Sequence, residues 1–474
     1  MTNKVTGIML AAANMQAERI YNNIQARERW PYKADTPEHG LDIARIFAEA
    51  SQTRGVRLVK DVAILAVSVF GLMHLSHNPT PDELMAGEEP TMNWLATLGT
   101  LVVVAAIQFF FLKSMRQRAR RALQEVTDSE STVGVGTASS DADGNVMISG
   151  GYSPFVGAGS TVQAWSFAVD LHKSATESMP VLPVTAQALY AETQTSIERL
   201  QLPRLTISDT VCLDGRDVGE VGGLLPSGRH RKPQPRLPQG EVDKLVGLND
   251  TKMRHYKLLR ADLWGGELVV SVFFRYVIQA GLLYVEAKIL QLTPLKDEFL
   301  EYEKMPTEPD FQEMRDDVIK SLVLAPFLWM GVAYRALKFL GGGWAELLHD
   351  PEKNNGKAID RDRKFNYGWP DSLREQWASE KYERYFQGVD LDFYQKSIQE
   401  ALLESLLTSL KARNVNVENF KQASTTIFNS GVMVSGGSFK AGSVAAGAGA
   451  SAVVSKVLGA AGRAAEGHKA PAAS

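Results

Sequence analysis

Cysteine is nearly absent from the chain of 474 residues: Cys212 is the only one, so no disulfide can form within it. A lone thiol is typical of a reducing cytosolic compartment, and we expect Cys212 to lie buried and inert in a strand. Gly-x-Ser-x-Gly, His-Glu-x-x-His, P-loop and dinucleotide-binding glycine motifs are also missing. Hydrolase, metallopeptidase and nucleotide-binding functions therefore lack their usual motifs, and the sequence predicts no catalytic residue, cofactor or metal.

Net charge is small as well. The formal charge of -3 predicts no general attraction to nucleic acid. A hydrophobic content of 45% and a charged content of 22% are ordinary for globular protein, so any membrane part is small. The length indicates about three structural units.

Charge is missing altogether over the nineteen residues from Trp94 to Leu112. About 20 apolar residues in a helix cross a bilayer core of roughly 30 Å, so this stretch predicts a membrane span. Cations follow it with no acid before Glu125, which indicates that the next part of the chain stays in the cytoplasm. One interpretation is that these cations only fix the topology, and the other is that they contact anionic lipid headgroups. They are Lys113, Arg116, Arg118, Arg120 and Arg121.

A second apolar stretch covers residues 62–75 and follows three cations between residues 54 and 60. The connecting residues 76–93 contain four acids and no Lys or Arg. This asymmetry predicts a two-helix transmembrane hairpin, with spans at about 58–75 and 94–112 and both termini in the cytoplasm of a bacterial inner membrane. The alternative is a buried soluble helix at 62–75, which would place the N-terminus outside.

Before the hairpin, residues 1–57 are predicted to be cytosolic helices. Helical spacing covers residues 8–30, and a second helix is expected to open at Thr36-Pro37 with Thr36 as its cap. Behind the hairpin, residues 113–160 hold the basic stop signal and a linker rich in Gly and Ser. Asp143-Gly144-Asn145 predicts a small hairpin turn in that linker.

A cytosolic α+β domain is expected over residues 161–312, because β-branched and aromatic residues alternate there between turn signals. A helix is predicted at 184–202, and Ala280-Gly281 is the turn of a hairpin. Arg275 and Glu286 are expected to face each other across that hairpin as a compensating buried pair. The predicted strands are 163–171, 205–213, 268–278 and 283–292.

A helical region, residues 313–413, is predicted next. It contains the apolar stretch 320–344, for which a buried helix and a helix at the membrane surface both stay open. Residues 371–413 have helical spacing, with a leucine stripe that predicts core packing. Residues 414–445 are expected to add a small strand segment, and the Ala/Gly-rich tail 446–474 is expected to be disordered.

For four further patterns we favour a structural interpretation over a functional one. The run RHRKPQPRLP at 229–238 predicts an extended, solvated loop rather than a nucleic-acid site, since aromatic residues for base stacking are missing. Glu346 and His349 have the spacing of metal ligands on a helix, but no second pair accompanies them. Asp141 and Asp143 resemble the start of a calcium loop that lacks its final acid. The glycines at 150–160 suit a flexible loop better than a phosphate cradle.

Several stretches together resemble uncharacterised two-span membrane proteins common in actinobacteria. The resemblance implies a shared cytosolic architecture over most of the chain after the hairpin, and it implies no activity and no functional residue. It is carried by GYSPFVGAGSTVQAWSFAVDL (151–171), LTISDTVCLDGRDV (205–218), WGGELVVSVFFRYV (264–277), LLYVEAKILQLTPL (282–295) and the tail NVNVENFKQASTTIFNSGVMVSGGSFKAG (414–442).

The combined expectation is a two-helix transmembrane hairpin attached to a cytosolic α+β domain with a helical C-terminal part. We expect a membrane-anchored cytosolic binding or scaffold protein without catalytic activity. Its expected partners are the lipid bilayer, anionic headgroups and an unidentified protein; a homo-oligomer is allowed and nucleic acid is not expected. One alternative is an effector whose hairpin oligomerises and perturbs the bilayer. Another is a membrane-anchored enzyme with a dispersed site.

Overall fold

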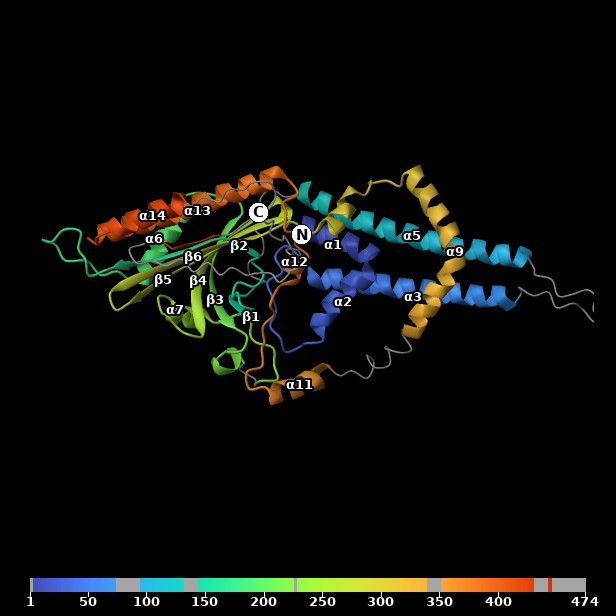
Figure 1. Cartoon of the computed structure of the whole chain (residues 1–474), viewed down its shortest axis with the longest axis horizontal. Coiled ribbons are helices and arrows are strands. Elements are labelled where there is room, and N and C mark those ends of the chain that lie inside the picture. Colours follow the sequence, from blue (N-terminus) through green and yellow to red (C-terminus); the bar gives the residue numbers. More distant parts are fainter. Residues whose placement is uncertain are drawn as a thin grey trace, which may run out of the picture.

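The computed structural model describes residues 3–73, 94–131, 144–225, 228–338, 351–429 and 442–445. Helices and one mixed sheet make up these residues, which confirms the predicted α+β class. Figure 1 shows an elongated molecule, with the sheet and its covering helices at one end. Two long helices project from the other end, α3 (Ile43–Met73) and α5 (Trp94–Ser131), and α9 (Phe311–Lys338) lies across them.

Seven strands form the sheet in the order β1-β3-β4-β5-β6-β2-β7. β1 is parallel to β3 and β7 is parallel to β2, while the other neighbours are antiparallel. All four predicted strands are present within a few residues of their expected bounds. The strands are β1 (Val146–Ser149), β2 (Ser160–Asp170), β3 (Leu205–Asp214), β4 (Met253–Leu263), β5 (Leu268–Gln279), β6 (Leu282–Leu292) and β7 (Gly442–Ala445).

The turn between β5 and β6 is the predicted one. Ala280 and Gly281 have φ angles of 49° and 73°, as a two-residue hairpin turn with the right-handed twist of its strands requires. Gly144 also has a positive φ, but β1 after it pairs in parallel with β3. The chain on the other side of the predicted hairpin turn, residues 132–143, lies outside the described residues.

One face of the sheet is covered by α6 (Ala186–Glu198), α13 (Tyr385–Ala412) and α14 (Glu418–Asn429), as Figure 1 shows. Alternate residues of β5, including Val272 and Phe274, point into this core. Leu402 and Leu406 of α13 meet them there, so the predicted leucine stripe is core packing. The opposite face carries a smaller cluster around Phe155, Tyr256 and Phe273.

The prediction of one helix over residues 371–413 is wrong. The chain forms a short α12 (Leu373–Gln376) and then α13, with residues 377–384 between them. Two of these intervening residues bond to the chain after β6. The Lys296 amide donates to the Trp377 carbonyl at 2.9 Å, and the Ser379 amide donates to the Pro294 carbonyl at 2.7 Å.

The N-terminal helices also differ from the prediction. Residues 8–30 form two helices, α1 (Lys4–Met15) and α2 (Ala17–Glu28), because Gln16 between them leaves the helical region with φ -118° and ψ 40°. The helix expected at Thr36 begins instead at Ile43, where the Asp42 carboxylate accepts the Arg45 amide at 3.0 Å. The Thr36 hydroxyl donates to the Glu38 carboxylate at 2.7 Å, so it caps no helix.

The projecting helices are continuous where the sequence suggested boundaries. α3 runs unbroken into the predicted first span, and α5 continues through the basic cluster to Ser131. Among the described residues one unbent helix, Leu95–Glu125, is long and apolar enough to cross a membrane, and its most apolar 18 residues have a mean hydropathy of 2.3. The two halves of α9, bent by 55° beyond Pro326, meet the same measure only together. α3 does not meet it, so the two-span hairpin stays a prediction.

The remaining helices are short. They border the sheet or link it to the N-terminal helices: α7 (Gln239–Leu245), α8 (Asp297–Leu300), α11 (Pro351–Arg361) and 3-10 turns at Val218–Glu220, Trp264–Gly266 and Glu301–Lys304.

Candidate functional site

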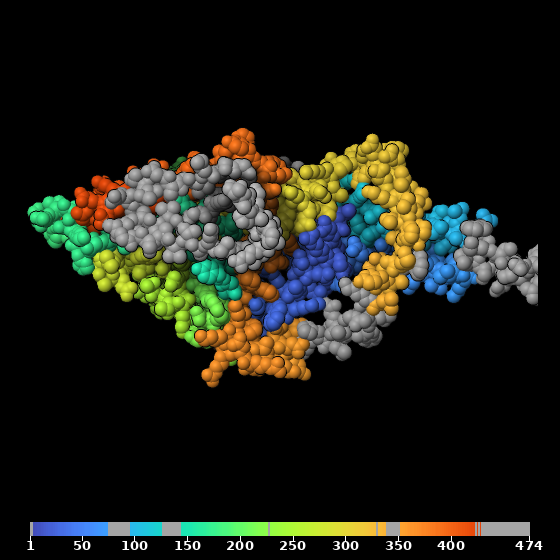
Figure 2. Space-filling view, viewed as in Figure 1, coloured from blue at the N-terminus to red at the C-terminus, as the bar shows by residue number. Residues whose placement is uncertain are grey.

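A pocket of about 160 Å³ opens where α2, the loop before α3 and the chain before α12 meet. Cavities of this size accommodate a benzene-sized molecule. Figure 2 shows the blue N-terminal segment lying against the orange chain that precedes α13. The side chains that give the pocket its chemistry are Arg27, Trp30, Lys33, Glu38, Lys232 and Trp369.

Lys33 is the most unusual group in this pocket. Its half-buried Nζ lies 4.5 Å from the ring centroid of Trp369 and 5.7 Å from that of Trp30. Nζ donates to the Gly368 carbonyl at 2.9 Å, and no carboxylate in the described chain lies within ion-pair distance of it. Burial lowers the pKa of Lys33, and the charge of Arg27 lowers it further. Lys33 is therefore a partly desolvated cation held by two indoles without a counter-charge.

Arg27 and Glu38 form the rigid wall of the pocket. The Arg27 guanidinium lies 5.1 Å from the Trp369 ring centroid and donates to Glu38 at 3.2 Å. The Glu38 carboxylate also accepts the backbone amides of Leu373 and Arg374, at 2.9 and 2.8 Å, at the start of α12. Burial raises the pKa of Glu38 and lowers the pKa of Arg27. The charge of Arg27 lowers the pKa of Glu38 and the charge of Glu38 raises the pKa of Arg27, but burial is the larger effect in both cases.

Arg374 fixes this wall to the sheet. Its side chain is fully buried, and Nη2 donates to the carbonyls of Glu267 at 3.1 Å and Thr293 at 2.7 Å. Burial lowers the pKa of Arg374 to about 10, so the guanidinium stays charged at neutral pH. Arg374 therefore joins the pocket wall to the start of β5 and the end of β6.

The charges in the pocket leave Lys33 available to a ligand. Glu28 is exposed at the rim. The other two acids of the pocket are paired with cations: Asp35 lies 2.5 Å from Lys232, and Glu38 pairs with Arg27. The arrangement suits a ligand with one anionic group for Lys33 and a flat apolar part for the indoles.

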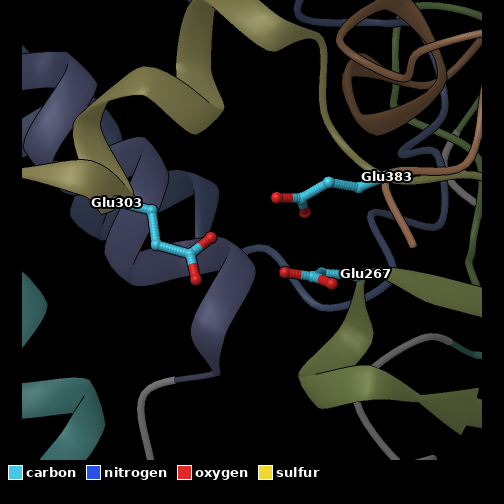
Figure 3. Close-up of side chains that lie close together, drawn as sticks. All are labelled: Glu267, Glu303 and Glu383. Carbon is cyan, nitrogen blue, oxygen red and sulfur yellow. The ribbon is translucent and has the colours of Figure 1, made fainter.

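A second polar group is a cluster of three carboxylates, Glu267, Glu303 and Glu383, which turn toward a common point in Figure 3. Lys4 fills this place: its Nζ lies 2.5 Å from Glu267 and 2.8 Å from Glu303. Burial raises the pKa of Glu267, whereas the two carboxylates raise the pKa of Lys4 despite its own burial. The cluster is thus an ion-pair network, and a metal ion would have to displace Lys4.

The predicted headgroup-binding cluster lies on α5, and two of its five cations are engaged within the protein. Arg116 and Arg120 both bind Glu313 of α9, and Arg116 also lies 2.8 Å from Asp317. Among described residues, the other three have no acidic partner, so their contact with headgroups stays a prediction. Those three are Lys113, Arg118 and Arg121.

The basic loop 229–238 is non-helical, as predicted, and several of its side chains bind other segments. Arg229 donates to the carbonyl of Asp362 at 2.6 Å, and His230 lies 2.8 Å from Asp360. The loop therefore docks on α11 and the residues after it.

On the far face of the sheet, Arg275 and Glu286 are directly opposite, with Nε donating to the carboxylate at 2.7 Å. This confirms the predicted pair. Cys212 on β3 is buried as expected, and burial raises the pKa of its thiol. The glycines of the 150–160 segment serve close packing: a Cβ on Gly159 would lie 2.0 Å from the Gln291 carbonyl oxygen.

Two predicted patterns lie outside the described residues, namely Glu346 with His349, and Asp141 with Asp143. The pocket around Lys33 was missed altogether. Its residues come from three segments separated by up to about 340 positions, and each looks ordinary alone. The one local signal is the pair of Trp-Pro steps, at Trp30-Pro31 and Trp369-Pro370, which places a rigid turn beside each indole.

The fold and its pocket define an α+β protein with one mixed seven-stranded sheet and a projecting helical arm. Residues 164–441, more than half of the chain, match the model of the AbeC-like domain. The chain therefore belongs to the AbeC-like domain family. Searches of the curated proteins and of the solved structures each found no match. Membrane insertion, the number of spans and an actinobacterial distribution stay predictions.

Proposed function

We propose that the chain is a membrane-anchored, cytosol-facing protein that acts by binding and takes a small anionic ligand in the pocket around Lys33. The observation that carries the proposal is the state of Lys33, a half-buried ammonium without a carboxylate partner in the described chain. Burying a cation without a counter-charge costs free energy. Such a group is typical of a site where the ligand supplies the negative charge.

The chemistry of the ligand follows from the contacts of Lys33. An ammonium has three protons to donate, and the Gly368 carbonyl accepts one of them. Two remain for a carboxylate or phosphate group. Trp30 and Trp369 offer apolar ring surface beside it, and the volume admits a ring-sized body.

The ligand proposal is tested with benzoate and phenyl phosphate as probes, by calorimetric titration of the detergent-solubilised full chain. We expect millimolar or tighter binding of at least one probe. Lys33→Gln should abolish it, while the control Lys173→Gln should leave it unchanged, because Lys173 is exposed and pairs with Asp170 elsewhere. Binding that survives Lys33→Gln, or no binding of either probe to the wild-type chain, would show the proposal to be wrong.

Membrane anchoring is supported by the projecting helices. Apolar side chains of both α3 and α5 point outward without a covering element in the described chain, among them Leu72, Leu98 and Val102. The two helices pack closely where Gly71 meets Thr100, and Lys60 donates to Gln108 at 3.2 Å. A soluble protein seldom exposes so many large apolar groups together.

Topology is measured with single cysteines, since Cys212 is buried and does not compete for labels. Thr80→Cys lies in the predicted outer loop and Ser178→Cys lies in an exposed part of the sheet domain. A membrane-impermeant maleimide should label Thr80→Cys in intact cells and Ser178→Cys only after permeabilisation. A second measurement is an alkaline wash of isolated membranes, which should leave the chain in the membrane pellet. Recovery of the chain in the supernatant of that wash, or the reverse labelling pattern, would contradict the proposed anchoring.

A further inference from the structure

α9 carries an apolar stripe that no described element covers. Its six members have exposed fractions between 48% and 68%. Spacings of four residues place the first three on one side of the first half of α9, and spacings of four and three place the last three on one side of the second half, beyond the 55° bend. They are Ile319, Val323, Phe327, Met330, Tyr334 and Leu337.

The opposite side of α9 is packed against the projecting pair. Ala325 and Val332 lie in one cluster with Ile64 of α3 and with Val104 and Ala105 of α5. The helix is therefore apolar on two sides, of which one is covered. A buried core helix would have both sides covered, so the alternative of a buried helix for residues 320–344 does not fit the described part of that segment.

α9 runs across α3 and α5 rather than along them (Figure 1). Ion pairs fix it at both ends. Glu313 near its start binds Arg116 and Arg120 of α5. Near its end, Arg335 donates twice to Asp61 of α3, at 2.7 and 2.9 Å. A bilayer crossed by α5 would therefore have α9 lying across the bilayer normal, with its two halves bent by 55° and its middle deeper than its start.

The depth of α9 follows from its contacts on α3. Arg335 binds Asp61, and Val332 packs in the cluster that contains Ile64. These two α3 residues are three positions apart, or about 4.5 Å along the helix. On α3 these contacts lie within about one helical turn of Asp61.

On α5, Ala105 and Val104 lie eight and nine residues from Lys113, or roughly 12–14 Å along the helix. The middle of α9 therefore reaches the deep limit of interfacial helices, which sit about 5–10 Å into the boundary between headgroups and acyl chains.

The stripe fits lipid better than a protein partner. It is continuous with the outward apolar surface of α3 and α5, which the proposed anchoring places in lipid. Residues 321–334 contain no charge, and the cations Lys320, Arg335 and Lys338 flank them, which suits anionic headgroups. We infer that α9 is an in-plane helix of the membrane interface whose outward stripe contacts the boundary of headgroups and acyl chains. This inference rests on the membrane anchoring proposed above.

The test uses the full chain in vesicles of phosphatidylcholine and phosphatidylglycerol, with an environment-sensitive nitrobenzoxadiazole label on single cysteines. Phe327→Cys probes the stripe, Val102→Cys probes the membrane part of α5, and Arg315→Cys is the matched control on an exposed polar position of α9. Nitroxide lipids quench each label at one depth. A nitroxide high on the acyl chain should quench Phe327→Cys about twofold, and Arg315→Cys hardly at all. Val102→Cys should be quenched more by a nitroxide near the chain end.

The outcomes separate the two proposals. An unquenched Phe327→Cys beside a quenched Val102→Cys overturns the in-plane helix and leaves the anchoring intact. If neither label is quenched, the anchoring itself fails, and the inference falls with it. Disulfide-linked dimers of Phe327→Cys without lipid quenching would show that a second copy of the chain covers the stripe instead.

Discussion

The buried guanidinium of Arg374 allows a quantitative test of how the pocket wall is joined to the sheet. We consider Arg374→Met, which keeps the length of the side chain and removes its donors. Two carbonyls, of Glu267 and Thr293, then lose their partner in a dry environment. A hydrogen bond from a charged donor contributes roughly 1.5–3 kcal/mol, so the loss of two such bonds predicts a destabilisation of about 3–6 kcal/mol.

The assay is urea or thermal unfolding of the solubilised chain, followed by circular dichroism. A loss of that size lowers the melting temperature by roughly 6–24 °C for a domain of about 150–250 residues. The control is Arg216→Met, because Arg216 is an exposed arginine bound to Asp214 on the same turn; it should change stability by less than about 0.5 kcal/mol. Equal stability of the two variants would refute the reasoning, since it would mean that desolvation of Arg374 cancels its hydrogen bonds.

Three further predictions concern other charged or reactive groups. Burial lowers the pKa of Lys33 in the folded state, so the unfolded chain binds more protons as pH approaches 10.5. The stability of wild type should therefore rise relative to Lys33→Met between about pH 7 and about pH 10 in thermal melts, and a constant gap would contradict this. Glu286→Gln leaves the charge of Arg275 uncompensated and should lower the free energy of unfolding in urea by about 2 kcal/mol. The double variant Arg275→Met with Glu286→Leu removes both charges and should be destabilised less. A larger destabilisation of the double variant would show that an uncompensated charge is not the cause. Cys212 should not react with a thiol-specific disulfide reagent until the chain unfolds, and stoichiometric reaction under native conditions would refute its burial.

The sheet could be predicted because its information is local. β5 and β6 combine β-branched and aromatic runs with a turn whose glycine can take a positive φ. Pairing across that turn then places Arg275 opposite Glu286 without further information. β4 was missed because charged residues such as Arg260 interrupt its apolar pattern.

The predicted helix boundaries were wrong where a group that could cap or continue a helix bonds to another group instead. Thr36 is a good cap in isolation, but its hydroxyl bonds the Glu38 carboxylate, which in turn binds the amides at the start of α12. Helical spacing likewise continued past Trp377, whose carbonyl accepts the Lys296 amide from another part of the chain. Neither contact has a sequence signature.

The pocket could not be predicted for the same reason, because its groups come from distant segments. Lys33 acquires its character only because Gly368 and Trp369 fold back onto it. In the sequence it is one lysine among many. Composition and spacing find sites whose groups are neighbours in the chain, whereas this site is assembled by tertiary structure.

The continuity of α5 has a mechanical consequence. A helix of 38 residues is about 57 Å long and has no hinge of its own. α5 and α3 both pack against α1, whose first residue, Lys4, pairs with Glu267 just before β5 and with Glu303. We expect a tilt imposed on the outer end of the arm to displace α1 rather than to be absorbed in a flexible joint. Through the ion pairs of Lys4, that displacement would reach the start of β5.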